Sequence, residues 1–312
     1  MKTFIQITEI WAPSHDRSML EFHGGLFGEH LGFRAATQKM CFGYDEGLPG
    51  KAWAQRHPII LNDLQDPLFR RRDAARNAGL TCGVAIPIFA GDILLAVLVF
   101  FCGDDEDHVG AIELWHNDST CSSDMGMVAG YFGIAESFQW VAQHTRFTKG
   151  FGLPGSVWQS GMPEIFKDLG HSNRFVRRDD ARRVGINKGL GLPSNYERGQ
   201  NYVLAFLSAL GTPIARRFEI WIPDESGTAL YFDSGQCDSE VDLLDDYAGV
   251  ALDRSNGLFG RMLLTGMPVA DESVASEGSP VGASALKAGL SSVVALPLLD
   301  AGVVKAVVAM YF

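Results

Sequence analysis

Two arginine-rich segments carry the residues of this chain that could do chemistry. Phe69-Arg70-Arg71-Arg72-Asp73 recurs as Phe175-Val176-Arg177-Arg178-Asp179. A planar guanidinium at a pocket mouth would hold a carboxylate or phosphate through two parallel hydrogen bonds. The candidate ligand-binding residues join these segments to two tryptophans that could stack on a planar ligand: Trp53, Phe69, Arg72, Asp73, Trp158, Phe175, Arg178 and Asp179. Two other interpretations stay open, because the same pattern is typical of an exposed charged helix face and of tryptophans packed in a core.

Catalytic and metal sites are not predicted from the remaining reactive residues. The eight histidines include no pair at metal-ligand spacing with a nearby cysteine. The five cysteines are scattered and form no C-x-x-C pair, which is typical of reduced thiols. We therefore predict no catalytic residue and no metal ligand, and the cofactor stays unknown.

The charge and the apolar runs of the chain argue against several classes of partner and location. The 312 residues have a formal net charge of −11, which argues against nucleic acid because that partner needs clustered lysine and arginine. The same sign argues against anionic membrane surfaces. The longest apolar run, Ile93 to Phe101, is too short to span a bilayer, and the first residues do not resemble a signal peptide. The sequence predicts a cytoplasmic protein.

One sequence unit is written three times. Gly47-Leu48-Pro49-Gly50 returns at Gly152 and, as Gly257-Leu258-Phe259-Gly260, at intervals of 105 residues. This period suits a small domain and is too long for a solenoid module. Other motifs also recur once in each copy, among them Glu9-Ile10-Trp11, Glu113-Leu114-Trp115 and Glu219-Ile220-Trp221. The predicted units are residues 1–105, 106–212 and 213–312, of which the third lacks the arginine-rich segment.

The elements that must position these residues are short. In the first copy the patterns predict, in order, strand Phe4 to Trp11, one or two strands within Met19 to Phe42, a helix from Gly50 to Ala54, strand Ile59 to Leu61, a helix from Pro67 to Ala78, and a hairpin of Val84 to Phe89 with Ile93 to Phe101. The predicted fold class is α+β. Each unit would be an antiparallel sheet with short helices on one face.

These motifs together resemble the GAF domain family. The resemblance lies in Gly-Leu-Pro-Gly-x-x-Trp, Pro-x-x-x-x-Asp-Leu, Phe-x-Arg and Ala-Gly-Leu followed by an apolar hairpin. In the first copy these motifs begin at Gly47, Pro58, Phe69, Ala78 and Val84; the second copy keeps nearly all of them from Gly152 to Ser208, and the third keeps few. The resemblance implies a sheet of about six strands, with a ligand pocket between the sheet and the facing helices.

The resemblance also implies a function. We predict a non-catalytic sensory or regulatory protein that binds a small organic ligand and signals through a protein partner or a homodimer. One alternative is a ligand-free interaction scaffold. Another is a thiol-dependent enzyme related to free methionine sulfoxide reductase, using Cys41, Cys82 or Cys102, although Lys51, Ser156 and Arg261 stand where such enzymes carry a cysteine.

The short connections between copies leave two arrangements open. The copies could be consecutive independent domains. Alternatively, the first strand of one copy could join the sheet of the copy before it, with Phe4 to Trp11 closing on Val303 to Phe312. The second arrangement would give three interlocked sandwiches.

Overall fold

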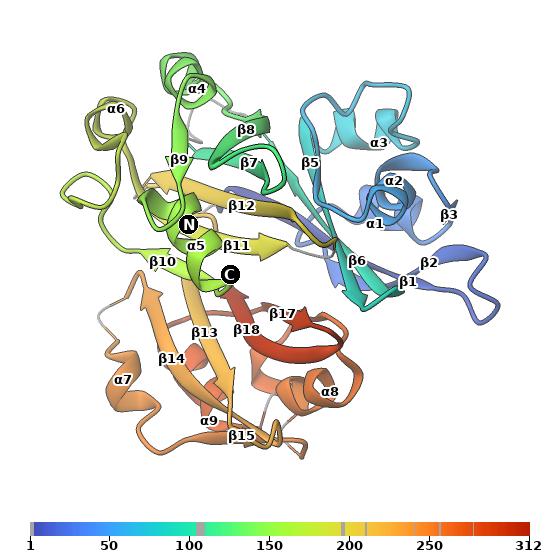
Figure 1. Cartoon of the computed structure of the whole chain (residues 1–312). Coiled ribbons are helices and arrows are strands. Elements are labelled where there is room, and N and C mark those ends of the chain that lie inside the picture. The colour runs from blue at the N-terminus through green and yellow to red at the C-terminus, as the bar shows by residue number, and fades with distance from the viewer. Residues whose placement is uncertain are drawn as a thin grey trace.

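Three antiparallel sheets of six strands each, with short helices, make up this computed structural model (Figure 1). The structure describes residues 3–103, 110–194, 197–209, 211–239, 241–255, 257–276 and 278–312. Each sheet uses consecutive strands, and we call β1 to β6 unit 1, β7 to β12 unit 2 and β13 to β18 unit 3. The boundary predicted between residues 105 and 106 lies outside the described residues.

The elements follow one order in all three units. Unit 1 contains β1 (Ile5–Pro13), β2 (Met19–Leu26), α1 (Leu31–Thr37), β3 (Cys41–Gly43), α2 (Gly47–Gln55), β4 (Ile59–Leu61), α3 (Arg72–Asn77), β5 (Cys82–Ala90) and β6 (Ile93–Cys102). Unit 2 contains β7 (Gly110–Asp118), β8 (Asp124–Tyr131), α4 (Glu136–Gln143), β9 (Arg146–Thr148), α5 (Gly152–Ser160), β10 (Glu164–Phe166), α6 (Arg178–Arg183), β11 (Ile186–Ser194) and β12 (Gln200–Ala209).

Unit 3 differs from the others only in its short elements. It contains β13 (Arg217–Pro223), β14 (Ala229–Cys237), α7 (Leu243–Asp246), β15 (Ala251–Asp253), α8 (Gly257–Thr265), β16 (Val269–Asp271), a 3-10 turn at Val274–Ser276, α9 (Pro280–Lys287), β17 (Val293–Asp300) and β18 (Val303–Tyr311). These elements confirm the predicted α+β class.

The sheets are not interlocked. The strand order is β3-β2-β1-β6-β5-β4 in unit 1, and the equivalent order recurs in the other two sheets. β1 pairs with β2 and β6, whereas β18 pairs with β13 and β17. Of the two arrangements left open, the alternative in which Phe4 to Trp11 closes on Val303 to Phe312 is therefore wrong, because each unit's last strand returns beside its own first strand.

Several local predictions needed correction. The region from Met19 to Phe42 contains α1 between its two strands, with Phe33 and Thr37 buried one helical turn apart. Helix α3 is shorter than predicted because the Asp66 side chain accepts from the Leu68 amide at 2.7 Å and holds the preceding residues in a turn. Helix α2 is longer than predicted, since Gly47 opens it and Pro49 fits its first turn.

Close packing explains the repeated glycines. Gly47 has a φ of +61°, and a Cβ atom there would lie 2.7 Å from the Phe42 ring. A Cβ atom on Gly50 would lie 2.1 Å from the Gly43 carbonyl oxygen, and one on Gly155 would meet the Thr148 carbonyl at 2.2 Å. Only glycine lets the helix approach the preceding strand this closely.

Both faces of each sheet are buried. One face packs on its own helices, as Val97, Val99 and Phe101 of β6 do. The alternate residues Leu98 and Phe100 instead join a cluster shared by all three units. Burial on both faces explains why β6 reads as a continuous apolar run.

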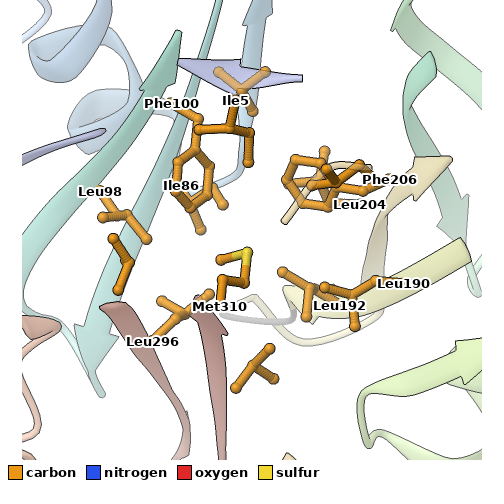
Figure 2. Close-up of a cluster of buried hydrophobic side chains, with 14 of the residues drawn as sticks. Ile5, Ile86, Leu98, Phe100, Leu190, Leu192, Leu204, Phe206, Leu296 and Met310 are labelled. Carbon is orange, nitrogen blue, oxygen red and sulfur yellow. The ribbon is translucent and has the colours of Figure 1, made fainter. Parts of the chain in front are cut away.

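The shared cluster is the centre of the molecule. Figure 2 shows side chains from the three sheets converging there: Ile5, Ile86, Leu98 and Phe100 from unit 1, Leu190, Leu192, Leu204 and Phe206 from unit 2, and Leu296 and Met310 from unit 3. The Phe100 and Phe206 rings meet edge to face, with 5.9 Å between centroids. The units therefore form one body around a common core, which the sequence did not predict.

The units meet head to tail around this core. Strand β4 contacts β8, β10 contacts β14, and β16 contacts β2. Strands β4, β10 and β16 hold the same place in their sheets, as do β2, β8 and β14. The same two strand positions meet at each junction, an edge strand of one sheet and the second strand from the opposite edge of the next, so the three units form a closed ring with approximate threefold symmetry.

None of the described helices is long and apolar enough to cross a membrane.

Candidate functional site

A buried ion pair lies between the sheet and the helices of unit 1. Glu9 on β1 is fully buried, and Arg71, just before α3, is 5% exposed. Arg71 Nη2 donates to Glu9 Oε2 at 2.9 Å, while Nη1 contacts both Glu9 Oε1 and Thr37 Oγ1. Thr37 Oγ1 donates to Glu9 Oε1 at 2.7 Å, and Trp11 Nε1 donates to Oε2 at 2.9 Å. The carboxylate is thus surrounded by donors, as a buried charge requires.

Aromatic rings surround the guanidinium of Arg71. Its Cζ lies 4.6 Å from the centroid of Phe33, 5.3 Å from Phe69 and 5.5 Å from Phe101. Ring faces stabilise a desolvated guanidinium, which is more weakly hydrated than an ammonium. The ion pair and its rings occupy the space between sheet and helices, where the family resemblance implies a ligand pocket.

Unit 2 repeats the arrangement. Arg177 is bidentate to Glu113, with Nη1 to Oε1 at 2.6 Å and Nη2 to Oε2 at 2.7 Å. Trp115 Nε1 donates to Glu113 Oε2 at 3.0 Å, and the Phe138 centroid lies 4.6 Å from Arg177 Cζ. Ala142 of α4 stands where unit 1 has Thr37. The hydroxyl is therefore not essential to the pair.

Unit 3 builds the same charge pair from a different segment. Its arginine, Arg217, lies on β13 two residues before the buried Glu219, so the two side chains share one face of the strand. Glu219 accepts from Tyr247 Oη at 2.6 Å, Tyr311 Oη at 2.8 Å, Trp221 Nε1 at 3.0 Å and Arg217 Nη1 at 3.3 Å. Burial raises the pKa of Glu219, and these hydrogen bonds and the charge of Arg217 oppose that rise.

The segment that stands in place of the arginine-rich run in the third copy contributes hydrogen bonds to this pair. Ser284 on α9 accepts from Arg217 Nη1 through its hydroxyl at 3.1 Å, and from Nη2 through its carbonyl at 3.2 Å. Ser284 Oγ in turn donates to Asp246 at 2.6 Å. In unit 3 the cation thus comes from the sheet, and α9 supplies Ser284 as its acceptor where units 1 and 2 have an arginine-rich segment.

Replacing Tyr311 by phenylalanine is expected to lower the free energy of unfolding by about 1.5–3 kcal/mol, the range for a hydrogen bond to a charged group. The change removes one donor to Glu219 and leaves the ring in place. Urea denaturation of the whole chain measures it. Tyr231→Phe, at a site 47% exposed, is the control and should change stability by less than about 0.5 kcal/mol. Equal effects of the two changes would show that the Glu219 contact contributes nothing.

The predicted site residues divide into two groups. Phe69 and Phe175 are buried and lie against the buried arginines. The four predicted charged residues are exposed in the first turns of α3 and α6: Arg72, Asp73, Arg178 and Asp179. In both segments the arginine that turns inward is the residue immediately before the one predicted.

The two predicted tryptophans pack in cores. Trp53 is half-buried against the core of unit 1, with its ring 5.2 Å from Tyr44 in an edge contact. Trp158 is 8% exposed within the core of unit 2, and Lys149 Nζ lies 5.7 Å from its ring. Both tryptophans thus pack in a core, one of the interpretations left open by the sequence. Neither is among the rings that surround the buried arginine of its unit.

The glutamates of the three pairs were missed by sequence reasoning. A signal for them existed, since each Glu-x-Trp repeat places a carboxylate and an indole on the same face of an apolar strand. A glutamate on an inward face needs a buried cation. The recurrence of that glutamate in all three copies pointed to such a cation near each strand.

The structure also contains cavities, one of which adjoins the unit 3 pair through Cys237, whose Sγ accepts from Arg217 Nε at 3.3 Å. Four cavities lined by described residues have volumes from ≈330 to ≈490 Å³, and none of the four is lined by a glutamate or arginine of the buried pairs. The ≈490 Å³ cavity lies between β14, the segment before α7 and Lys167 of unit 2. Another, of ≈410 Å³, lies between Met162 of unit 2 and the β17–β18 hairpin of unit 3.

The cysteines differ in their surroundings. Cys82 and Cys102 are fully buried, and burial raises the pKa of the Cys102 thiol far above its usual value, whereas Cys41 is exposed. Burial also opposes ionisation of the half-buried Cys237, but hydrogen bonds with Ser239 and from Arg217 lower its pKa overall. No cluster of three or more metal-binding side chains occurs among the described residues.

Comparison with known proteins identifies the unit. A GAF domain family model matches residues 10–115. No curated protein sequence matches the chain. The GAF domain of A. aeolicus nlh2 in an inactive state is 16% identical with a TM-score of 0.27, over 33% of this chain and 60% of that one. A free methionine-R-sulfoxide reductase from Neisseria meningitidis in complex with its substrate is 13% identical, with a TM-score of 0.25, over 31% and 52%.

A third solved structure is similar to the same extent. The GAF domain of a phosphoenolpyruvate-protein phosphotransferase from Coxiella burnetii is 18% identical with a TM-score of 0.27, over 31% of this chain and 56% of that one. The chain thus spans roughly half to three fifths of the length of these structures. The matched residues run from β1 to the Trp115 of β7, one full period of the repeat. That match identifies residues 10–115 as a GAF domain, and the six-stranded sheet of this unit recurs in units 2 and 3.

Proposed function

We propose that this chain is a non-catalytic regulatory protein that acts as an interaction scaffold, with no small molecule between sheet and helices. One observation carries the proposal: in every unit a buried glutamate and arginine, with their aromatic neighbours, occupy that space. The family is one of sensory and regulatory domains, and the output would pass to a partner protein. Because the inner sheet faces are buried within the chain, partners or a second copy would use the outer surfaces.

Admitting a ligand to this space would carry a large energetic cost. The ligand would have to displace Arg71 or Arg177 and leave a buried glutamate without its counter-charge. Separating a buried ion pair without replacement costs several kcal/mol. A ligand could recover this only by presenting its own cation to the glutamate. Binding of a small organic ligand is therefore the competing proposal, and it makes an opposite prediction.

A thermal-shift screen of metabolites and nucleotides against the whole chain separates the two. The scaffold proposal expects no compound to raise Tm appreciably, because a ligand at 100 times its Kd would add about 2.7 kcal/mol of stability. A compound that raises Tm in the wild type but not in Glu9→Gln/Arg71→Met or Glu113→Gln/Arg177→Met would overturn it. A shift retained in both double variants would place the ligand outside the buried pairs of units 1 and 2.

A further inference from the structure

The three junctions of the ring differ in chemistry at equivalent positions. The second residue after α2, α5 and α8 is His57, Met162 and Met267, respectively. Tyr202 faces His57 across the junction of units 1 and 2, and the shared strand registers align Tyr202 with Ala306 and Ala96 in the other two sheets. The two methionines pack against the central core. Among the described residues, imidazole rings stack at this position only between units 1 and 2.

Three rings form a stack at that junction. The His57 ring of unit 1 lies on the Tyr202 ring of unit 2, with 4.5 Å between centroids and 16° between planes. His116 on β7 lies on Tyr202 as well, at 4.4 Å and 30°. The phenol is thus in contact with two imidazoles, one from each unit. We call these three residues the His-Tyr-His seam.

Each imidazole of the seam uses one ring nitrogen in a hydrogen bond. His57 Nδ1 lies 2.9 Å from the Pro58 carbonyl oxygen, so Nδ1 carries the proton. His116 Nε2 lies 2.6 Å from Gln200 Oε1. Neither remaining ring nitrogen has a hydrogen-bond partner among the described residues. A second proton on His57 would add a charge and a donor without an acceptor at a half-buried position.

The neighbouring charged groups already have partners. Arg56, next to His57, lies 3.3 Å from Asp92 and 3.8 Å from Glu197. Asp118, at the end of β7, accepts from Thr120 and interacts with Gln200. Glu197 attracts a charged His57, and this attraction is the smallest of the four effects on the pKa of His57. No described carboxylate pairs directly with either imidazole.

We propose that the His-Tyr-His seam is an acid-sensitive switch that loosens the junction of units 1 and 2 while the other two junctions stay closed. Burial lowers the pKa of His57, the Pro58 carbonyl raises it, and a charged His116 lowers it further. The unfolded or opened chain therefore binds the proton more readily. Stability of this junction is constant above the ordinary histidine pKa of about 6.5 and falls as the pH drops below it.

Hydrogen exchange of the whole chain at about pH 7.5 and about pH 5.5, corrected for intrinsic rates, tests the switch. We expect amides of β4, β7 and β12 to exchange faster at acid pH by up to about tenfold, the most that protonation of one histidine of ordinary pKa in the opened state can add at a pH one unit below about 6.5. Amides of β10, β14, β16 and β2 should not respond. Uniform acceleration at all junctions, or none at the first, would overturn the proposal.

The chain supplies its own matched control. The variant His57→Met/Tyr202→Ala/His116→Ile copies the residues of the junction between units 2 and 3, where Met162, Ala306 and Ile222 stand. It should lose the acid response of β4, β7 and β12. His57→Met alone keeps the other two rings and should lose most of the response, so a failure of the triple variant to fold leaves the test intact. A wild-type response retained in His57→Met also contradicts the switch.

Discussion

Replacing Arg71 by methionine is expected to lower the free energy of unfolding by about 3–5 kcal/mol, because it leaves a carboxylate buried without its counter-charge. Methionine keeps an unbranched apolar side chain among Phe33, Phe69 and Phe101, so the lost charge is the main change. Glu9 retains only Trp11 and Thr37 as donors. Urea denaturation of the whole chain measures the loss, and the slope shows whether the three units still unfold together.

The neighbouring arginine provides the control for this result. Arg72 is exposed one residue further on, and Arg72→Met should change stability by no more than about 0.5 kcal/mol. The double variant Glu9→Gln/Arg71→Met removes both charges and should recover most of the loss, since a neutral amide can still bond to Trp11 and Thr37. If Arg71→Met and Arg72→Met cost the same, the buried pair is not what stabilises unit 1.

Two adjacent phenylalanines should distinguish the central core from the core of unit 1. Phe100→Ala and Phe101→Ala are each expected to cost about 3–5 kcal/mol, because both side chains are fully buried. Their effects should differ in location. Phe100 meets Phe206 of unit 2, whereas Phe101 packs on Phe33 and Phe69 of its own unit. Hydrogen exchange should therefore accelerate in β12 for Phe100→Ala, and only within unit 1 for Phe101→Ala.

Comparison of the exchange patterns of Phe100→Ala and Phe101→Ala tests whether the central cluster couples the units. Similar total losses with different exchange patterns would establish that the central cluster holds the units together. Identical patterns would mean that unit 1 unfolds as a block whichever face is damaged, and the shared core would then add little to the coupling between units. Val99→Ala, a smaller truncation on the same face as Phe101, should reproduce the unit 1 pattern at lower amplitude.

The positions of helices and strands were predictable where the residue type changes sharply along the chain. Glycine and proline marked the ends of elements, and the apolar runs marked β5 and β6. The packing of β6 was not predictable, because Leu98 and Phe100 on one face are as apolar as Val97 and Val99 on the other. A strand buried on both sides does not reveal which side meets its own helices and which meets another unit.

Sequence reasoning singled out, as ligand-binding segments, the runs that hold the buried arginines of the first two copies, but it named the exposed residue that follows each of them. Which arginine of a run points inward depends on the backbone of the turn before the helix, and that geometry is not visible in the residue types. In the third copy the cation is Arg217, on the same strand as Glu219. The alternation of a strand already placed those two side chains together, and the absence of the arginine-rich segment was the reason to look for them.

The closed ring limits the number of copies that this gene can carry. In an open repeat array, the last unit leaves a free surface on which another unit can be added. Here β16 already contacts β2, so no free pair of these strand positions remains to receive a fourth copy. Removal of one copy would instead expose the apolar faces of the other two. Gains and losses of whole repeats, common in open arrays, should therefore be absent from the history of this chain, and change must come within the three existing copies.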